Sequence, residues 1–375
     1  MSRSATARAA DGALALAAAM GIGRFAYTAL LPATQRALGV GDDVAGALAS
    51  ANLVGYLAGV LQARRVAGGP ECRGWLRAGI GTTAIATALG AATTSVWAWA
   101  ALRFAAGVAS GLVFVLASAA ALEGAARSGL LYAGVGIGIA LSGVVSALIP
   151  PAAGYALPWL LLGAAAAALG ARAWLRLGTP PVSGGTASAA AGPPTLTIGL
   201  LGAAYFLEGL GYIVSGTFAV AAVRRTPGLE GLAAWTWVLT GLAAAPSALL
   251  WADAGQRFGT RGALTLAYLV QAIGMALPSL SRSAAAALGG SALFGSTFLG
   301  IVALTMSAAR GLSPGAPGRA VGTLTALYGV GQILGPLLAG AASQRMGGDP
   351  RPAALGAAVA VAIGGALLGF ARERG

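Results

Sequence analysis

Long apolar stretches, each about 20 residues, follow one another along almost the whole chain. A helix of that length crosses the roughly 30 Å of hydrocarbon in a bilayer, because each residue adds about 1.5 Å. Inside lipid, every backbone polar group must be bonded within the protein, so helices are the expected structure. Only 9% of the residues are charged, against about 25% in soluble domains. We therefore expect an all-α integral membrane protein.

Twelve transmembrane helices are predicted, in two sets of six. The first set is 11–37, 43–65, 75–94, 96–120, 129–150 and 156–175, and the second is 197–222, 230–253, 262–280, 283–309, 319–341 and 352–371. Between the sets lies "LGTPPVSGGTASAAAGPP", whose Pro, Gly, Ser and Thr content is typical of a linker. We expect an N-terminal six-helix bundle in 1–175, a cytoplasmic linker in 176–196 and a C-terminal six-helix bundle in 197–375.

The basic residues are all arginines, and their placement predicts the orientation. If the N-terminus is inside, fifteen arginines lie on inner loops and ends and six on outer ones. Positive charge concentrates on the cytoplasmic side of membrane proteins, so we expect both termini in the cytoplasm and a multi-pass protein of the inner membrane. The net charge of +13 does not indicate nucleic-acid binding, because the arginines are scattered between apolar stretches and form no patch.

Several residue types are missing, and their absence disfavours whole classes of chemistry. Cys72 is the only cysteine and there is no histidine, so an internal disulfide, a zinc site built from several Cys or His ligands, and Ser-His catalysis are excluded. Without lysine, the phosphate-binding loop of a primary pump cannot form. We therefore expect no enzymatic activity, no metal and no cofactor.

The two halves of the chain resemble each other at three places that occur in the same order. These are "GIGRF" (21–25) with "GLGYI" (209–213), "LVGYLAG" (53–59) with "LTGLAAA" (239–245), and "YAGVGIG" (132–138) with "LYGVGQI" (327–333). The nearly constant offset indicates two six-helix repeats in parallel orientation, and therefore two pseudo-symmetric bundles.

Twelve spans, a central linker and this repeat resemble the major facilitator superfamily (MFS). Three stretches, "GIGRFAYTALLP", "YFLEGLGYIVSGTF" and "TALYGVGQILGPLLAG", resemble the YbfB/YjiJ-type transporters more narrowly. The resemblance implies the MFS fold and alternating access to a substrate cavity between the halves. We expect a small-molecule substrate, protons as the coupling ion and a monomer in the lipid bilayer.

The chain departs from the superfamily pattern in ways that leave the direction of transport open. The loop signature G-x-x-x-D-R-x-G-R-R appears as "DAGQRFGTR" (253–261), with Gln256 where Asp is expected. The resemblance assigns a gating loop to Asp253, Arg257, Gly259 and Arg261. Ile139 takes the proline position of the signature associated with exporters. Efflux of a small organic solute is slightly favoured, proton-coupled uptake is the alternative, and a non-transporting sensor or scaffold is the rival from another class.

Arg24 lies near the middle of the first span. Facing lipid there would cost an arginine about 2.5–3.5 kcal/mol, and the family geometry points the first and seventh spans at the cavity. We expect Arg24 to anchor an anionic or polar substrate group, with Tyr27 on the same helix face. The alternative is a structural arginine bonded to neighbouring backbone carbonyls.

Two further charged residues are candidates for proton coupling. Glu208 is the carboxylate placed deepest inside a span, and it aligns with a position one turn before Arg24. It is either a proton carrier or one member of a fixed ion pair that joins the halves. Arg103 resembles the fourth-span arginine that the superfamily associates with proton coupling. The alternative is a side chain that snorkels to the membrane interface.

Polar and aromatic residues one turn apart suggest the lining of the cavity. Asn52 with Tyr56, and Tyr328 with Gln332, are spaced to share helix faces, and Tyr212 lies one turn after Glu208. Such groups suit a small organic ligand, with helix packing as the alternative. Trp235 and Trp237 fit an interfacial aromatic belt better than a ligand site.

Overall fold

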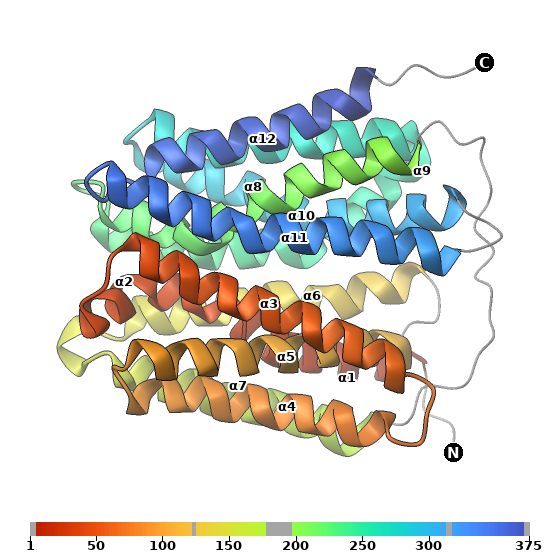
Figure 1. The fold of residues 1–375 in the computed structure, drawn as a ribbon, viewed down its shortest axis with the longest axis horizontal. Coiled ribbons are helices and arrows are strands. Elements are labelled where there is room, and N and C mark those ends of the chain that lie inside the picture. The colour runs from red at the N-terminus through yellow and green to blue at the C-terminus, as the bar shows by residue number, and fades with distance from the viewer. Residues whose placement is uncertain (1–4, 122–124, 178–196, 313–316, 371–375) are drawn as a thin grey trace.

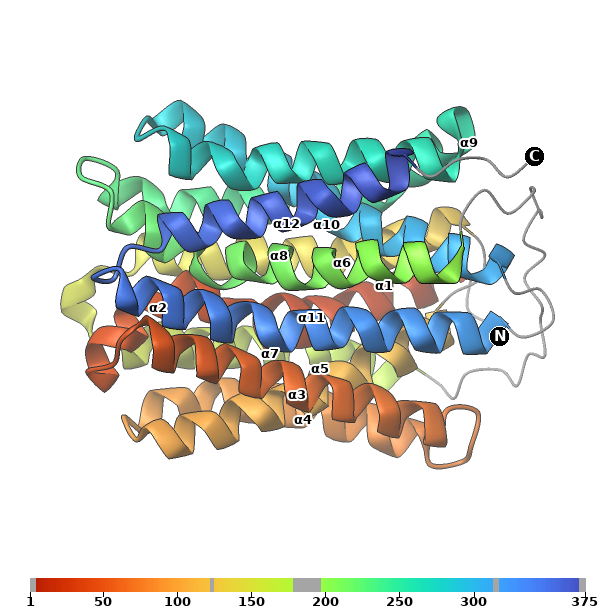
Figure 2. The same cartoon turned by 45° about the horizontal axis from the view of Figure 1, so that its top comes forward.

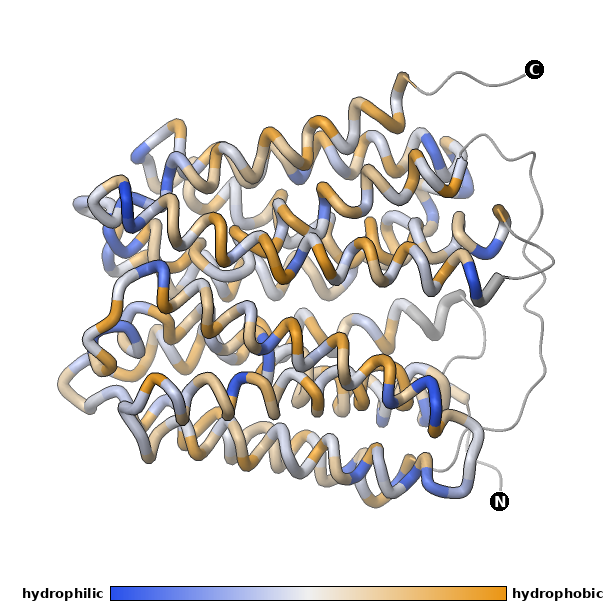
Figure 3. Tube along the Cα trace, viewed as in Figure 1, coloured by the Kyte–Doolittle hydropathy of each residue, from blue (hydrophilic) through white to orange (hydrophobic). Residues whose placement is uncertain are grey.

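The computed structural model describes residues 5–121, 125–177, 197–312 and 317–370. Within these ranges the chain is helical and contains no strand, which confirms the all-α prediction. Ten of the described helices are long and apolar enough to cross a membrane. In the tube of Figure 3, hydrophilic residues gather toward the two ends of the helices and apolar residues fill their middle. This distribution is the one that a bilayer requires.

The helix bounds agree closely with the predicted spans. The N-terminal half consists of α1 (Ala5–Leu16), the π-helical turn η1 (Ala17–Ile22), α2 (Ala26–Leu38), α3 (Asp42–Val66), α4 (Cys72–Leu89), α5 (Val96–Ala121), α6 (Ala125–Leu148) and α7 (Ala156–Arg176). The C-terminal half consists of α8 (Ile198–Arg224), α9 (Ala233–Leu280), α10 (Ala284–Leu312), α11 (Pro317–Arg345) and α12 (Arg351–Phe370). Short 3-10 turns occupy connections between helices: η2 (Gly90–Ala92), η3 (Pro151–Ala153) and η4 (Glu230–Leu232).

Two elements differ from a simple series of single spans. Helices α1, η1 and α2 together form one span, Ala5–Leu38. Helix α9 runs for 48 residues, but Gly259 inside it has φ 74° and ψ 151°, so two helices meet at this glycine. Forty-eight residues of helix measure about 72 Å, more than twice a bilayer core, which favours two crossings. The total of twelve stays a prediction, because α4 is not among the ten candidate spans.

The two halves lie against each other along the long axis of the molecule. In Figure 1, α1 to α7 occupy the lower part and α8 to α12 the upper part, and Figure 2 shows α3 and α11 still side by side after rotation. Most of the predicted linker, residues 178–196, lies outside the described residues. We name the left side of Figure 1, where α2 ends and α3 begins, the Asp42 end.

Glycines allow the halves to approach closely. A Cβ added to Gly46 on α3 would lie 2.2 Å from the carbonyl oxygen of Pro336 on α11. A Cβ on Gly136 of α6 would lie 2.5 Å from the carbonyl oxygen of Gly241 on α9. Both neighbours are backbone atoms that cannot move aside, so these contacts between the halves require glycine.

The first span is interrupted at its middle. The backbone N–H groups of Arg24 and Phe25 both donate to the carbonyl oxygen of Met20, at 3.3 and 3.2 Å, where the π-helical turn η1 gives way to α2. A π-helical turn disturbs the regular ladder of an α-helix and is frequent at functional sites. Here it leaves the carbonyls of Gly23 and Arg24 available to donors from another helix.

Candidate functional site

Arg24 occupies the interruption of the first span and is only 5% exposed. Its Nη2 donates a hydrogen bond of 2.9 Å to the hydroxyl of Tyr212 on α8. The guanidinium carbon lies 4.8 Å from the ring centroid of Tyr56 and 5.1 Å from that of Phe25, within the range of a cation–π interaction. Its Nε has no hydrogen-bond partner, and no carboxylate contacts Arg24 within the described residues. The partners that Arg24 has are all neutral.

An aromatic wall lies beside Arg24 on the C-terminal half. Tyr212 stacks on Tyr328 and on Phe298, with ring centroids 5.6 and 5.9 Å apart, and Tyr328 stacks on Tyr205 at 4.2 Å. Gln332 donates from Nε2 to the Tyr212 hydroxyl at 2.6 Å. Helices α8, α10 and α11 therefore supply flat apolar faces and one shared hydroxyl at the place where Arg24 enters.

The contacts between the first and eighth helices follow the internal repeat. Arg24 bonds Tyr212, and the Thr28 hydroxyl donates to the carbonyl oxygen of Gly216; both pairs are separated by 188 residues. This is the offset at which "GIGRF" aligns with "GLGYI". Equivalent positions of two related halves meet only at the axis that relates them, so Arg24 lies at that axis.

Arg103 on α5 stabilises the interruption that holds Arg24. Its Nη1 donates to the carbonyl oxygen of Gly23 and its Nη2 to that of Arg24, both at 3.3 Å. Its guanidinium carbon lies 4.5 Å from the ring centroid of Tyr27. Arg103 is 5% exposed, so the idea that it snorkels to the interface is wrong. The role of a helix-capping cation explains its burial.

Two of the predicted ligand-binding residues lie near Arg103. Asn52 donates from Nδ2 to the backbone carbonyl of Arg103 at 2.8 Å. Tyr27 donates its hydroxyl to the carbonyl of Ala45 at 3.1 Å. The predicted substrate-binding residues therefore fall into two groups. Tyr56, Tyr212, Tyr328 and Gln332 gather with Arg24, whereas Tyr27 and Asn52 brace the helices around it.

Glu208 is fully buried inside the C-terminal half. Its Oε1 accepts a hydrogen bond of 2.7 Å from Nε2 of Gln271 on α9, and its Oε2 has no partner within the described residues. Across that part of the chain, no hydrogen bond or ion pair joins Glu208 to Arg24. The structure therefore contains no fixed ion pair between Glu208 and Arg24.

The predicted gating loop makes its contacts within the C-terminal half. Asp253 and Arg257 form an ion pair of 2.9 Å one turn apart on α9, with both side chains more than half exposed. Gly259 is the point where the two helices of α9 meet. Arg261 donates to the carbonyls of Leu368 and Gly369 at 2.8 and 2.7 Å, and so caps the last described turn of α12. None of these contacts reaches the other half.

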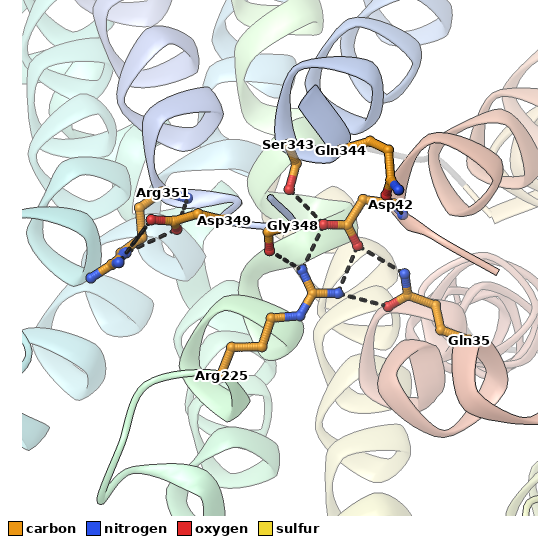
Figure 4. A network of polar contacts seen from close by, with 8 residues as sticks. All are labelled: Gln35, Asp42, Arg225, Ser343, Gln344, Gly348, Asp349 and Arg351. Atoms are coloured by element: carbon orange, nitrogen blue, oxygen red, sulfur yellow. Dashed lines mark hydrogen bonds and ion pairs between the residues drawn. The ribbon is translucent and has the colours of Figure 1, made fainter. Parts of the chain in front are cut away.

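A polar network at the Asp42 end does join the two halves (Figure 4). Asp42, whose side chain is 1% exposed, accepts from Nη1 and Nη2 of Arg225 at 2.6 and 2.7 Å. Ser343 on α11 donates to the same carboxylate at 2.5 Å, and Gln35 on α2 donates at 2.8 Å. A bidentate arginine–carboxylate pair with two more donors is a strong polar contact.

Arg225 and its surroundings complete this network. Arg225 also donates to the carbonyl of Gly348 at 2.8 Å, and the hydrogen bonds to Asp42 raise the pKa of its guanidinium. Beside it, a bidentate contact with Arg351 lowers the pKa of the Asp349 carboxyl. Sequence reasoning missed the network, because its members come from three separate places in the chain and each resembles an ordinary loop residue.

We expect Asp42→Asn to loosen the Asp42 end. The substitution removes the charge pair with Arg225, which is worth about 2 kcal/mol for a partly exposed pair with hydrogen bonds to charged groups. That corresponds to about a thirtyfold shift toward opening. The measurement is the rate at which a membrane-impermeant thiol reagent, added from the Asp42 side, labels Ser50→Cys in a Cys72→Ser background. Ser50 donates to the Ile333 carbonyl at 2.8 Å across the halves.

The matched control is Asp43→Asn, which removes the neighbouring carboxylate on the exposed face of α3. This control should leave the labelling rate unchanged. Equal labelling of Ser50→Cys in the Asp42→Asn and Asp43→Asn proteins would show that the Asp42 network does not hold the halves together.

Trp237 is buried, so the prediction that it belongs to an interfacial belt is wrong. It is 1% exposed, and its ring centroid lies 6.3 Å from that of Phe25 in the other half. It therefore belongs to the packing around Arg24 and not to an interfacial belt. Trp235, at 44% exposed, keeps a surface position that fits the belt.

Two helical halves that meet around a buried, repeat-related polar contact match the fold of major facilitator proteins. Three solved structures share the fold over nearly their whole length. They are a nucleoside transporter, NupG (TM-score 0.75, 12% identity, 99% of this chain and 100% of that one), a bacterial homologue of the human lysosomal transporter Spinster (0.74, 16%, 99% and 98%), and the human organic anion transporter MFSD10 (0.65, 18%, 97% and 98%).

The family itself is identified by sequence. The model described as "Uncharacterised MFS-type transporter YbfB" matches residues 16–368, and the chain belongs to this family. The chain is thus a multi-pass membrane protein of a transporter family, as the resemblance predicted. No curated protein matches the sequence.

Proposed function

We propose that the protein is a secondary active transporter that moves a small organic anion across the inner membrane by alternating access. The observation that carries the proposal is Arg24, a buried cation on the axis between the halves whose partners are all neutral. The family and the fold support transport in general, and this one side chain supports the class of solute.

The argument for an anion rests on charge compensation. A buried charge is costly unless an opposite charge and hydrogen bonds compensate for it. Two buried aspartates meet this rule, since Asp42 contacts Arg225 and Asp11 contacts Arg172 at 2.7 Å. Arg24 instead contacts a hydroxyl and two aromatic rings. Such a site is suited to a solute that carries the negative charge itself.

The aromatic residues support an organic solute with a flat apolar part. Tyr212, Tyr328 and Phe298 form a stack of rings, and its member Tyr212 bonds the guanidinium of Arg24. Pockets for small organic ligands combine such apolar faces with a few placed polar groups, here Tyr212 and Gln332. A carboxylate bound to Arg24 and a ring against Tyr328 fit this chemistry.

Glu208 is the proposed site for the coupling proton. Its carboxyl group lies away from every cation that the structure describes, and its single partner is the neutral amide of Gln271. A charged carboxylate in this place would lack a counter-ion, so protonation of Glu208 would stabilise its buried position. Tyr212 lies one turn along α8 from Glu208 and contacts Arg24, which gives α8 a means to link proton and solute.

The arginine distribution supports an orientation with both termini in the cytoplasm, so that the Asp42 end faces outward. The bonded Asp42 network would then close the outer side. Proton-driven efflux is the direction that we favour slightly, and proton-coupled uptake is the alternative. A non-transporting sensor or scaffold would bind a solute at Arg24 without moving it.

A reconstitution experiment tests the proposal. Purified protein is screened by thermal shift against aromatic carboxylates and their neutral amides, and the compounds that raise the melting temperature are then followed in proteoliposomes. We expect carboxylates to bind in preference to their amides, and a pH gradient to drive their accumulation. Preferential binding of the amides would rule out the anion, and binding without any flux or exchange would favour the sensor.

A further inference from the structure

A cavity lies at the Asp42 end of the molecule, and Arg24 is not among the residues that line it. Its volume is about 340 Å³, and its walls come from α2, the end of α6 with the turn η3, the start of α7, and the last residue of α8. All of the wall belongs to the N-terminal half except Arg224, which belongs to the C-terminal half. An occupant of this cavity would therefore touch both halves.

Two arginines give the cavity its charge. Arg36 of α2 and Arg224 of α8 line it, and no Asp or Glu does. The Nε of Arg224 is buried without a hydrogen-bond partner, and neither guanidinium forms a hydrogen bond or ion pair with the rest of the described chain. Glu230 acts on Arg224 electrostatically but forms no ion pair with it; Glu230 is exposed, and its Oε1 accepts from the Gly228 N–H at 3.2 Å.

Arg225, the next residue in the chain, differs from Arg224 in its hydrogen bonds. Arg225 makes four hydrogen bonds, to Asp42, Gln35 and Gly348, and is thereby fully used in the network between the halves. Arg224 points into the cavity and keeps its donors unused. Two guanidinium groups that line one cavity without hydrogen bonds to the described chain, and no acid in the wall, match the charge of a phosphate group.

The remaining wall is mostly apolar, apart from Ser146 and Tyr155, and its prolines make it stiff. Four prolines line it, at positions 32, 150, 151 and 158, together with Leu30 and Ile149. The volume lies at the small end of the range of about 300–1,000 Å³ for ligand pockets. The cavity stands where α2 and α8 end, at the depth of lipid head groups in a membrane-spanning bundle. These properties suit a small phosphate ester with an apolar neighbour.

We propose that this cavity binds a phosphate-bearing anion, held by Arg36 and Arg224, and that its binding stabilises the closed Asp42 end. The anion is either the head group of an acidic phospholipid or a free phosphate compound. Because Arg224 comes from one half and Arg36 from the other, the bound anion ties the halves together next to the Arg225–Asp42 pair. This site is separate from Arg24 and Glu208, and it regulates opening without taking part in transport chemistry.

The test compares lipid and free-anion binding in the full-length protein. One arm measures the melting temperature and the retained lipid, by native mass spectrometry, with phosphatidylglycerol and with phosphatidylcholine. The other arm replaces the lipid with inorganic phosphate or glycerol phosphate. The variant combines Arg36→Gln with Arg224→Gln, and the control is Arg282→Gln, an exposed arginine after α9.

We expect the wild type and the control to bind phosphatidylglycerol or the free phosphate at least about tenfold more tightly than the double variant, since two charge-assisted hydrogen bonds are lost. Arg224→Lys, which keeps the charge, should retain most of the binding and shows whether the fold tolerates change at this position. Stabilisation by phosphatidylglycerol assigns a lipid, and stabilisation by phosphate alone assigns a free anion. Equal stabilisation by phosphatidylcholine, or equal binding by the double variant, overturns the proposal.

Discussion

Arg24→Ala should weaken binding of the transported anion by at least about thirtyfold, corresponding to the roughly 2 kcal/mol or more that is lost when one member of a desolvated charge pair is removed. The physical reason is that Arg24 is the one cation that the structure places beside Tyr212 at the axis, with no other counter-charge for the solute. The measurement is isothermal titration of the purified protein with the aromatic carboxylate found in the thermal-shift screen.

Two variants separate an anchor from a structural arginine. Arg24→Lys keeps the charge but loses the planar group that stacks on Tyr56, so it should bind the anion with intermediate affinity. Arg282→Ala removes an exposed arginine after α9 and should bind as the wild type does. If Arg24→Ala binds the anion as tightly as Arg282→Ala while remaining folded, the anchor role is excluded.

Glu208→Gln should abolish accumulation driven by a pH gradient and leave exchange of the solute close to the wild-type rate. The substitution keeps the size of the side chain and the possibility of an amide contact with Gln271, but the new side chain cannot carry a proton. We expect at least about a hundredfold loss of gradient-driven accumulation if Glu208 is the proton carrier, equivalent to about 2.7 kcal/mol. The assay follows labelled solute in proteoliposomes with and without a pH gradient.

Two control variants test whether the effect depends on the hydrogen bond to Gln271 and on the buried position of the carboxylate. Gln271→Leu removes the partner of Glu208 and should change the pH at which transport is half-maximal without abolishing the response to the gradient. Glu230→Gln removes an exposed carboxylate near α9 and should have no effect. Gradient-driven accumulation that survives in Glu208→Gln would remove this residue from the coupling mechanism.

Most of the fold was predictable because a bilayer reduces the choices. Apolar length predicted most of the helices, and the predicted bounds 96–120 agree with Val96–Ala121 of the structure. The exception is instructive. The first span is interrupted by η1 and the turn around Arg24, and a run of Ala and Gly carries no signal for a π-helical turn. The break depends on tertiary donors, since Arg103 accounts for the exposed carbonyls.

The site was predictable only where the repeat or a rare charge indicated it. Arg24 and Glu208 were predicted as site residues because charges are rare at mid-membrane. The alignment of "GIGRF" with "GLGYI" indicated Tyr212. Gln271 was missed, because an isolated amide in a span does not reveal its partner. Asp42 and Arg225 were missed because their pairing depends on how two halves dock, which local patterns do not contain.

The contact between Arg24 and Tyr212 has a consequence for the origin of such a protein. A dimer of two identical six-helix chains must place the same side chain on both sides of its axis. Two arginines meeting there would repel each other in a dry environment, and two tyrosines would supply no charge. A single cation at the axis therefore requires two copies that are free to diverge, as the two halves of one polypeptide are.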